Sequence, residues 1–183
     1  MVISPANLVT QSTLNVLCTM PQSDPQPKII TVTTRGVTRS SHAALPLLLK
    51  PLYSYLLGPA IEDKLGAERA IAYSAGWEWD AKDAGEPGED IMGPGDWKKR
   101  EGLPAPGVLK RVLIVHGAIF TDGECIAEKP KGKGKDKRGV GYRVSERELG
   151  GWTISRKDVA HFIVDAALNR WDEFEQKRVN IAY

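Results

Sequence analysis

Apolar residues follow two different spacings along the chain, and the two spacings alternate. A helical spacing occurs at residues 5–20, 61–76 and 155–171, and strand-like runs rich in β-branched residues occur at 28–37, 111–120, 141–145 and 178–183. Helices that alternate with short apolar strands are typical of a parallel sheet with crossover helices. The pattern therefore predicts an α/β fold.

The predicted helix at 61–76 has one apolar side, formed by Ile61, Leu65 and Ile71. Its acidic residues are expected on the other faces, in the first half, where negative charge suits the helix dipole: Glu62, Asp63 and Glu68. Gly76 is expected to end the helix as a C-terminal cap. Lys64 lies near the helix start. Whether its amine takes part in catalysis is the main question that the sequence raises.

The predicted helix at 155–171 has a clear start. Ser155 is a good N-cap, and Asp158 follows three residues later, close to a capping box. Val159, Phe162 and Ala166 belong to its apolar stripe. His161 lies on the same helix and is expected to pack there.

Three segments do not follow either spacing. Residues 77–107 are rich in Gly, Pro and acidic residues and predict an irregular excursion, which in a compact domain is usually functional or mobile. Residues 45–58 are rich in leucine and form a second small core or a surface for a partner or apolar ligand. Residues 129–139 alternate lysine with glycine and are interpreted as a solvated loop, with phosphate or nucleic-acid contact as the alternative.

Composition places the chain among globular proteins. Its 183 residues are 42% hydrophobic and 26% charged, which suits a single domain spanning 1–183. A net charge of only +2 makes nucleic acid an unlikely partner. Two distant cysteines and three scattered histidines predict no metal site and no disulfide framework. Without a secretory signal or a long apolar run, we expect a cytoplasmic protein that does not cross a membrane.

Read together, four segments resemble the second half of the NmrA-like, atypical short-chain dehydrogenase/reductase proteins, which bind NAD(P) on a Rossmann fold. These segments are Ile29–Val37, Asp63–Arg69, Ala118–Glu124 and Ile154–Ile163. The resemblance covers most of the chain outside the excursion and the lysine-rich loop. It implies a partial Rossmann-like parallel sheet, a truncated domain that lacks the N-terminal Gly-rich strands.

The sequence departs from this family at three places. It contains neither GxGxxG nor GxxGxxG, the turn whose free amides hold the cofactor pyrophosphate, so no cofactor is firmly expected although the resemblance makes NAD(P) the candidate. Ala60 stands four residues before Lys64, where the wider superfamily has its proton-donating tyrosine. His116-Gly117 stands where family members commonly have Arg-Pro.

The candidate site residues follow from these positions. The catalytic candidates are Lys64, His116 and Tyr55, and the substrate-binding candidates are Thr33, Thr34, Tyr53 and Phe120. Each also has an ordinary structural interpretation: a surface ion pair of Lys64 with Glu68, a packed histidine, or β-propensity for the threonines. The carboxyl ends of the strands are where open α/β sheets bind ligands.

Three functions are compatible with these residues. The first is a truncated NAD(P)-binding-type protein that does not perform standard NAD(P)H reduction alone and keeps a small-molecule crevice at the strand ends. The second is a cofactor-independent isomerase, cyclase or lyase that uses His116 and Lys64 as acid and base on an apolar substrate. The third is a regulatory binding module. In the family's strand order the first strand of this chain would have an exposed edge, which predicts a homo-oligomer.

Overall fold

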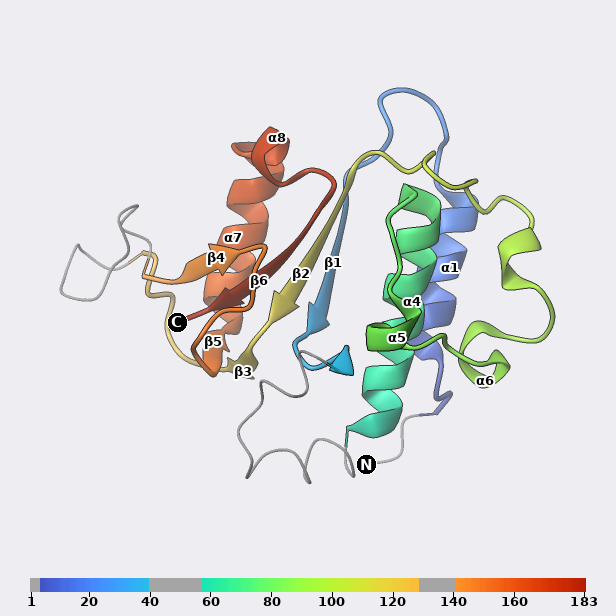
Figure 1. Cartoon of the computed structure of the whole chain (residues 1–183). Helices are drawn as coiled ribbons and strands as arrows, with labels where there is room; N and C mark the ends of the chain where they lie inside the picture. The colour runs from blue at the N-terminus through green and yellow to red at the C-terminus, as the bar shows by residue number, and fades with distance from the viewer. Residues whose placement is uncertain (1–3, 40–56, 129–140) are drawn as a thin grey trace. The chain divides into compact units, whose positions relative to one another are not determined.

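The computed structural model describes residues 4–39, 57–128 and 141–183 (Figure 1). The candidates Tyr53 and Tyr55, most of the leucine-rich segment and the lysine-rich loop lie outside these residues. The chain forms two compact units, which we describe separately. Unit 1 comprises Met1–Pro27 and Gly36–Lys110, and unit 2 comprises Lys28–Arg35 and Arg111–Tyr183.

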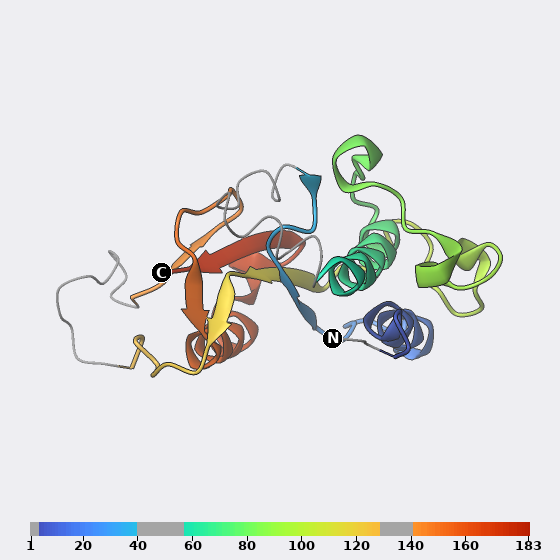
Figure 2. The same ribbon diagram turned by 90° about the horizontal axis from the view of Figure 1, so that it is seen from below.

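Unit 1 is built on two long helices that lie side by side (Figures 1 and 2). Its described helices are α1 (Leu8–Thr19), α4 (Gly58–Ala75), α5 (Ala81–Ala84), α6 (Glu89–Met92) and the 3-10 helix η1 (Trp97–Lys99). The predicted helices at 5–20 and 61–76 are confirmed. Gly76 ends α4 with a φ of 71° and donates its backbone N–H to the preceding turn, as its sequence position predicts.

A buried carboxylate of α4 caps the start of α1. Asp63 is only 2% exposed and accepts hydrogen bonds from the backbone N–H groups of Val9 (2.8 Å) and Thr10 (2.7 Å). These amides belong to the first turn of α1, where no intrahelical partner exists. The expectation that Asp63 and Glu68 lie on exposed faces is therefore wrong: both are buried, and Asp63 stabilises the N-terminus of the neighbouring helix.

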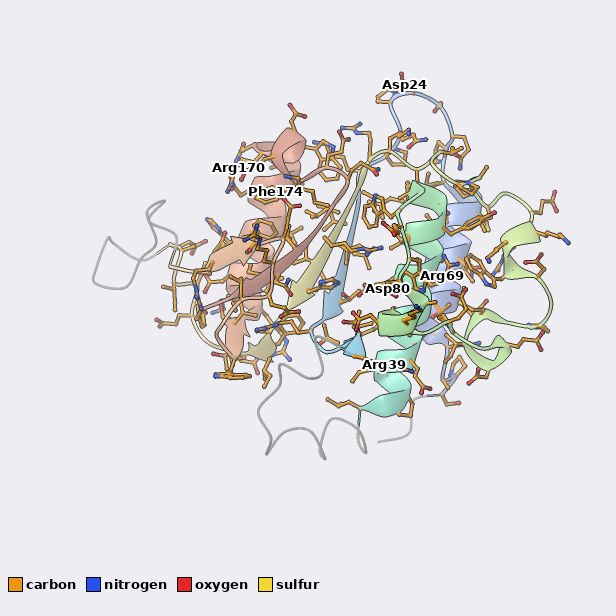
Figure 3. The ribbon with its side chains drawn as sticks, viewed as in Figure 1. Asp24, Arg39, Arg69, Asp80, Arg170 and Phe174 are labelled. Atoms are coloured by element: carbon orange, nitrogen blue, oxygen red, sulfur yellow. The ribbon has the colours of Figure 1, made fainter. Side chains whose placement is uncertain are left out.

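Residues 77–107 are less irregular than the glycines and prolines predict, because two aspartates start short helices. Asp80 accepts the N–H of Lys82 at the start of α5, and Asp96 accepts the N–H of Lys98 at the start of η1. Arg69 of α4, labelled in Figure 3, also contacts this segment. Its side chain pairs with Glu86 at 2.9 Å and lies 5.2 Å and 5.7 Å from the ring centroids of Trp79 and Trp97.

Unit 2 contains the sheet. The order is β1 (Ile29–Thr34), β2 (Val112–Gly117), β6 (Lys177–Ala182), β4 (Arg143–Ser145). β1, β2 and β6 are parallel, and β4 is antiparallel to β6. A second, two-stranded parallel sheet pairs β3 (Ile119–Thr121) with β5 (Thr153–Ser155). The predicted α/β class with a parallel, partial Rossmann-like sheet is confirmed.

The strand predicted at 111–120 is two strands in two sheets. β2 ends at Gly117, and the backbone N–H of Ala118 donates to the carbonyl of Ile181 at 3.1 Å before β3 begins. The ring of Phe120 folds back onto Gly117 so closely that a Cβ there would lie 2.2 Å from Cε1. The apolar residues continue across this break from Val112 to Phe120, so the apolar pattern did not reveal it.

Two helices complete unit 2. α7 (Arg156–Leu168) crosses one face of the sheet, and the shorter α8 (Trp171–Phe174) follows it (Figure 1). The helix predicted at 155–171 is thus one long and one short helix. Ser155 caps α7 as predicted, since its Oγ accepts the backbone N–H of Asp158 at 3.0 Å. Phe162 of α7 is fully buried in the core, with its ring centroid 5.0 Å from that of Phe174.

The helices in residues 4–39, 57–128 and 141–183 include none with the length and apolar character that a bilayer crossing requires.

The contact of α4 with α1 gives a direct test of the unit 1 packing. In the Gly66→Ala variant the new Cβ would lie 2.4 Å from Oγ1 of Thr10 and 2.5 Å from Cγ2 of Ile91. We expect the free energy of unfolding in urea to fall by about 1–2 kcal/mol, because overpacking outweighs the better helix propensity of alanine.

Gly58→Ala is the matched control on the same helix, since no heavy atom outside its chain neighbours and its own helix backbone lies within 4 Å of a Cβ built there. We expect its stability to stay within about 0.5 kcal/mol of the wild type, because Pro59 restricts the residue before it and offsets the better helix propensity of alanine. A Gly66→Ala variant as stable as Gly58→Ala would contradict the close packing of α1 on α4.

Candidate functional site

Polar side chains line up where the parallel strands of unit 2 end. Thr33 of β1 is in register with His116 of β2, which is in register with Asn180 of β6 and then Ser145 of β4. Register partners point to the same face of a sheet. The alternate residues Leu113 and Val115 lie in the core beneath α7. These four side chains, which we call the carboxyl-end row, therefore lie on the face opposite α7.

The four side chains of the row make different contacts. Asn180 donates to the carbonyl of Arg147 at 3.2 Å, and Ser145 accepts the N–H of the same residue at 3.0 Å. Both thus hold the loop after β4. Thr33 is 1% exposed and His116 is half-buried, and each is engaged in an interaction within the molecule. Together they place a hydroxyl and an imidazole on neighbouring strands.

Two other predicted residues of unit 2, one in each sheet, do not belong to the row. Thr34 is in register with Gly117, one step beyond the row. Phe120 packs against the core and lies under the guanidinium of Arg156, 5.9 Å from the ring centroid. The structure thus brings Thr33 and His116 together, and it places Thr34 and Phe120 outside the row.

Lys64 belongs to unit 1, so the carboxyl-end row is built without it. The side chain is half-buried on α4. Burial lowers the pKa of Lys64, and the carboxylates of Glu68 and Asp63 oppose that shift. Ala60 occupies the preceding turn of the same helix, so α4 supplies no phenol at that position.

A buried carboxylate outside the row organises the end of β5 and the start of α7. Asp158 is fully buried and accepts hydrogen bonds from both backbone and side-chain donors. The backbone donors are the N–H groups of Ile126 (3.1 Å) and Ala127 (3.0 Å). The side-chain donors are Tyr183 (2.6 Å), Ser155 (3.0 Å) and the Cys125 thiol (3.3 Å). One side chain thus fixes the loop at 125–127 and the C-terminal residue to α7.

The charge on Asp158 follows from these contacts. Burial alone would raise the pKa of Asp158, but the hydrogen bonds from Tyr183, Ala127 and Ile126 lower it more, so the pKa lies below the ordinary 3.8. Burial also raises the pKa of Cys125 and of Tyr183, which keeps both as neutral donors. Asp158 is therefore an ionised carboxylate surrounded by protonated hydrogen-bond donors. Its role is to stabilise the fold, and it is not available as a base.

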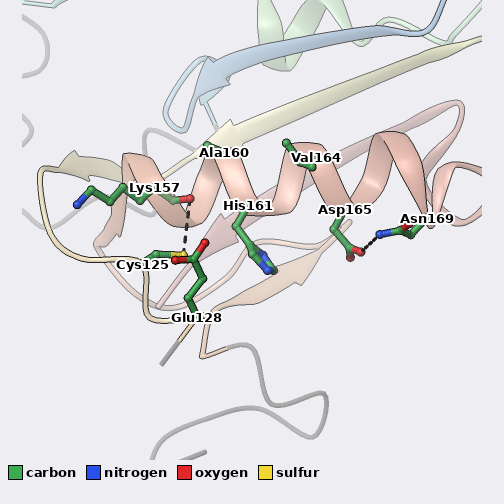
Figure 4. A pocket seen from close by; sticks show the side chains of 8 residues that line it. All are labelled: Cys125, Glu128, Lys157, Ala160, His161, Val164, Asp165 and Asn169. Atoms are coloured by element: carbon green, nitrogen blue, oxygen red, sulfur yellow. Dashed lines mark hydrogen bonds between the residues drawn. The ribbon is translucent and has the colours of Figure 1, made fainter. Parts of the chain in front are cut away.

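The loop fixed by Asp158 forms one wall of a pocket on the outer side of α7 (Figure 4). The pocket has a volume of about 450 Å³. Its lining residues are Cys125, Glu128, Lys157, Ala160, His161, Val164, Asp165 and Asn169. His161 was expected to pack on α7, and this pocket was not predicted from the sequence. The available signal was the spacing of Lys157, His161, Asp165 and Asn169, four residues apart on one helix face.

Asp158→Asn tests the role of the buried carboxylate. The asparagine side chain has the shape of the carboxylate but no charge, and its NH₂ group would face hydrogen-bond donors. We therefore expect the free energy of unfolding, measured in urea at pH 7, to fall by about 3 kcal/mol. Because the folded pKa is below the unfolded one, this stabilisation is present above pH 3.8 and is lost as pH falls through the folded pKa.

The exposed Asp172→Asn variant is the control and should change stability by less than about 0.5 kcal/mol. Equal stability of the Asp158 and Asp172 variants at pH 7 would show that the carboxylate does not hold the loop.

Comparison with known proteins gives a reductase as a relative. No family model matches the sequence. The chain is 27% identical over 159 residues to Reductase pytE of Aspergillus terreus, which covers 86% of this chain and 48% of the reductase. The chain therefore spans about half the length of the curated relative that it matches.

Among solved structures, a short-chain dehydrogenase/reductase (wide type) from Veillonella parvula DSM 2008 in complex with NADP aligns with a TM-score of 0.47 and 11% identity. The alignment covers 98% of this chain and 69% of that protein. The sequence comparison thus relates most of the chain to about half of a reductase.

Proposed function

We propose that the chain is the substrate-side half of an NAD(P)-binding, reductase-like protein of the NmrA-like, atypical short-chain dehydrogenase/reductase kind. On its own it does not perform NAD(P)H reduction. Its similarity to about half of a reductase supports the reductase-like assignment. The carboxyl-end row is the observation on which the substrate-side assignment rests.

The row has the position and chemistry of a substrate crevice. Ligands of open parallel sheets bind outside the carboxyl ends of the strands, and Thr33 and His116 are adjacent there on β1 and β2. The imidazole of the half-buried His116 can hydrogen-bond a carbonyl or hydroxyl oxygen and can also donate or accept a proton, while the buried Thr33 supports the strand beside it. The proposed ligand is a small apolar molecule with one such oxygen.

The residues of this chain do not fit the cofactor by themselves. A dinucleotide pyrophosphate needs a strand, a glycine-rich turn and the free amides of a helix N-terminus, and the sequence contains neither GxGxxG nor GxxGxxG. Within the described residues, β2 leads through Ala118 into β3 and not into a helix. In this proposal the nucleotide-binding portion is supplied by another segment, and no reaction step is assigned to this chain alone.

A chimera tests the proposal. The segment of the Aspergillus terreus reductase that aligns with this chain is replaced by the chain, and NADPH binding and carbonyl reduction are measured. We expect the chimera to bind NADPH. The His116→Ala version should lower kcat/KM roughly tenfold while leaving NADPH affinity unchanged, because the imidazole acts on the substrate side.

Asn169→Ala, on the far side of α7, is the control and should leave kcat/KM unchanged. A folded chimera that binds no NADPH would count against the reductase-like assignment. Loss of NADPH affinity in the His116→Ala version would count against the substrate-side role.

The outer edge of β1 supports a second part of the proposal, a homo-oligomer. The N–H of Ile29 donates to the carbonyl of Arg111, just before β2, and the N–H of Arg35 donates to the carbonyl of Gly117 at the end of β2. Because N–H groups alternate along a strand, those of Ile30, Val32 and Thr34 point away from β2. Among the described strands, β2 alone pairs with β1. An open strand edge favours pairing with another chain, and in the isolated protein we propose a second copy as its partner.

Light scattering coupled to gel filtration measures this directly. We expect a mass of at least two chains of 20.1 kDa. In the Val32→Lys variant a charge at the outer strand should shift the mass toward that of one chain, because an edge lysine opposes strand pairing. A well-folded wild-type monomer at high micromolar concentration would contradict the proposed edge pairing.

A further inference from the structure

The pocket on α7 is separate from the carboxyl-end row and has its own chemistry. It is lined by residues of α7 and of the loop before β4 (Figure 4). The row lies on the face of the sheet opposite α7. Its volume of about 450 Å³ falls in the range of small-molecule sites, about 300–1,000 Å³. Ala160 and Val164 give it an apolar surface, and Val164 is 55% exposed.

The walls of the pocket are held in place without a ligand. On one side, Asp158 fixes the backbone of Ile126 and Ala127, which leads directly into Glu128. On the other side, α7 is packed into the core through Phe162. A preformed pocket binds with a smaller loss of conformational entropy than one that must be ordered by its ligand.

The imidazole of His161 is held by a buried phenol. The hydroxyl of Tyr142, a residue only 3% exposed, lies 2.9 Å from Nδ1 of His161. Burial, followed by the charges of Asp165 and Asp158, raises the pKa of Tyr142, so the phenol keeps its proton. The Tyr142 hydroxyl can thus donate to Nδ1 of His161, and this contact helps to fix the position of the imidazole at the pocket.

Two carboxylates lie on either side of His161 along α7 (Figure 4). Hydrogen bonds from Asn169 and Arg170 lower the pKa of Asp165, so this carboxylate is ionised, with its charge partly balanced by Arg170. Glu128 on the opposite wall adds a second negative charge. The ammonium of Lys157 extends away from His161, toward the start of the helix (Figure 4).

The charges in the pocket favour some classes of ligand over others. Two carboxylates disfavour an anion, and the polar lining disfavours a purely apolar molecule. The described residues contain no group of three or more His, Cys, Asp or Glu side chains arranged for a metal ion. Two carboxylates beside an apolar surface suit a ligand that combines a positive charge with an apolar body.

We propose that the α7 pocket binds a small organic cation, a protonated amine attached to an apolar group. The ammonium is held by the carboxylates of Glu128 and Asp165, and the apolar group lies on Ala160 and Val164. This inference is independent of the proposed reductase-like function, because the pocket shares no residue with the carboxyl-end row.

Paired probes of the same shape test the proposal. Benzylamine is protonated at pH 7, and benzyl alcohol is its neutral counterpart. Both are titrated into the full ¹⁵N-labelled chain, and the shifts of the backbone amides give the affinity and the location. We expect benzylamine to bind at least about tenfold more tightly than benzyl alcohol, with shifts concentrated in residues 157–169 and around Cys125.

Glu128→Gln removes one of the two carboxylates without changing its size, and we expect about a tenfold loss of benzylamine affinity with no change for benzyl alcohol. Glu101→Gln, an exposed glutamate of unit 1 outside the pocket, is the matched control and should bind both probes as the wild type does. The amide spectrum reports folding of each variant. Equal affinity for the two probes, or unchanged benzylamine binding by Glu128→Gln, would overturn the proposal.

Discussion

The parallel pairing of β2 with β1 on one side and β6 on the other is the constraint on which the candidate site depends. The three strands come from segments far apart in the sequence, and β2 is almost fully buried between them. Because the side-chain period of a strand is two, a register shift by one residue would move His116 to the α7 side of the sheet. The register therefore determines that Thr33 and His116 are neighbours.

In both units a buried aspartate on one helix binds backbone amides of a segment that is distant in the sequence. In unit 1, Asp63 of α4 binds the first amides of α1. In unit 2, Asp158 of α7 binds the amides of Ile126 and Ala127. An ionised carboxylate is tolerated in the interior only when several donors surround it, so each aspartate couples the position of one segment to that of another.

The sequence predicted those features that local physics determines. Ser155 and Gly76 were identified as helix caps, and the β-branched runs gave β1 and β6, because capping and strand propensity act over a few residues. The break at Ala118 depends on the packing of the Phe120 ring against Gly117, and the local sequence pattern does not predict this packing. Asp63 was expected on a face away from the core because a charged side chain is usually solvated. It is buried because it binds backbone amides that lie more than fifty residues away in the sequence.

The candidate site was predictable to the same extent. The strand ends indicated Thr33 and His116, since parallel strands bring their carboxyl ends together. The faces were not predictable for Thr34 and Phe120, because they depend on register and on the turn at Ala118. The α7 pocket combines a helix stripe with a loop fixed by Asp158, so the role of His161 appears only in three dimensions.

The central claim is that this chain retains a substrate-side site and lacks the part that holds the cofactor. Titration of the isolated chain with NADPH, followed by quenching of its five tryptophans, tests that claim most directly. The account predicts no saturable quenching up to about 1 mM NADPH, a limit of roughly −4 kcal/mol in binding free energy. Saturable binding in the micromolar range by the isolated chain would contradict it.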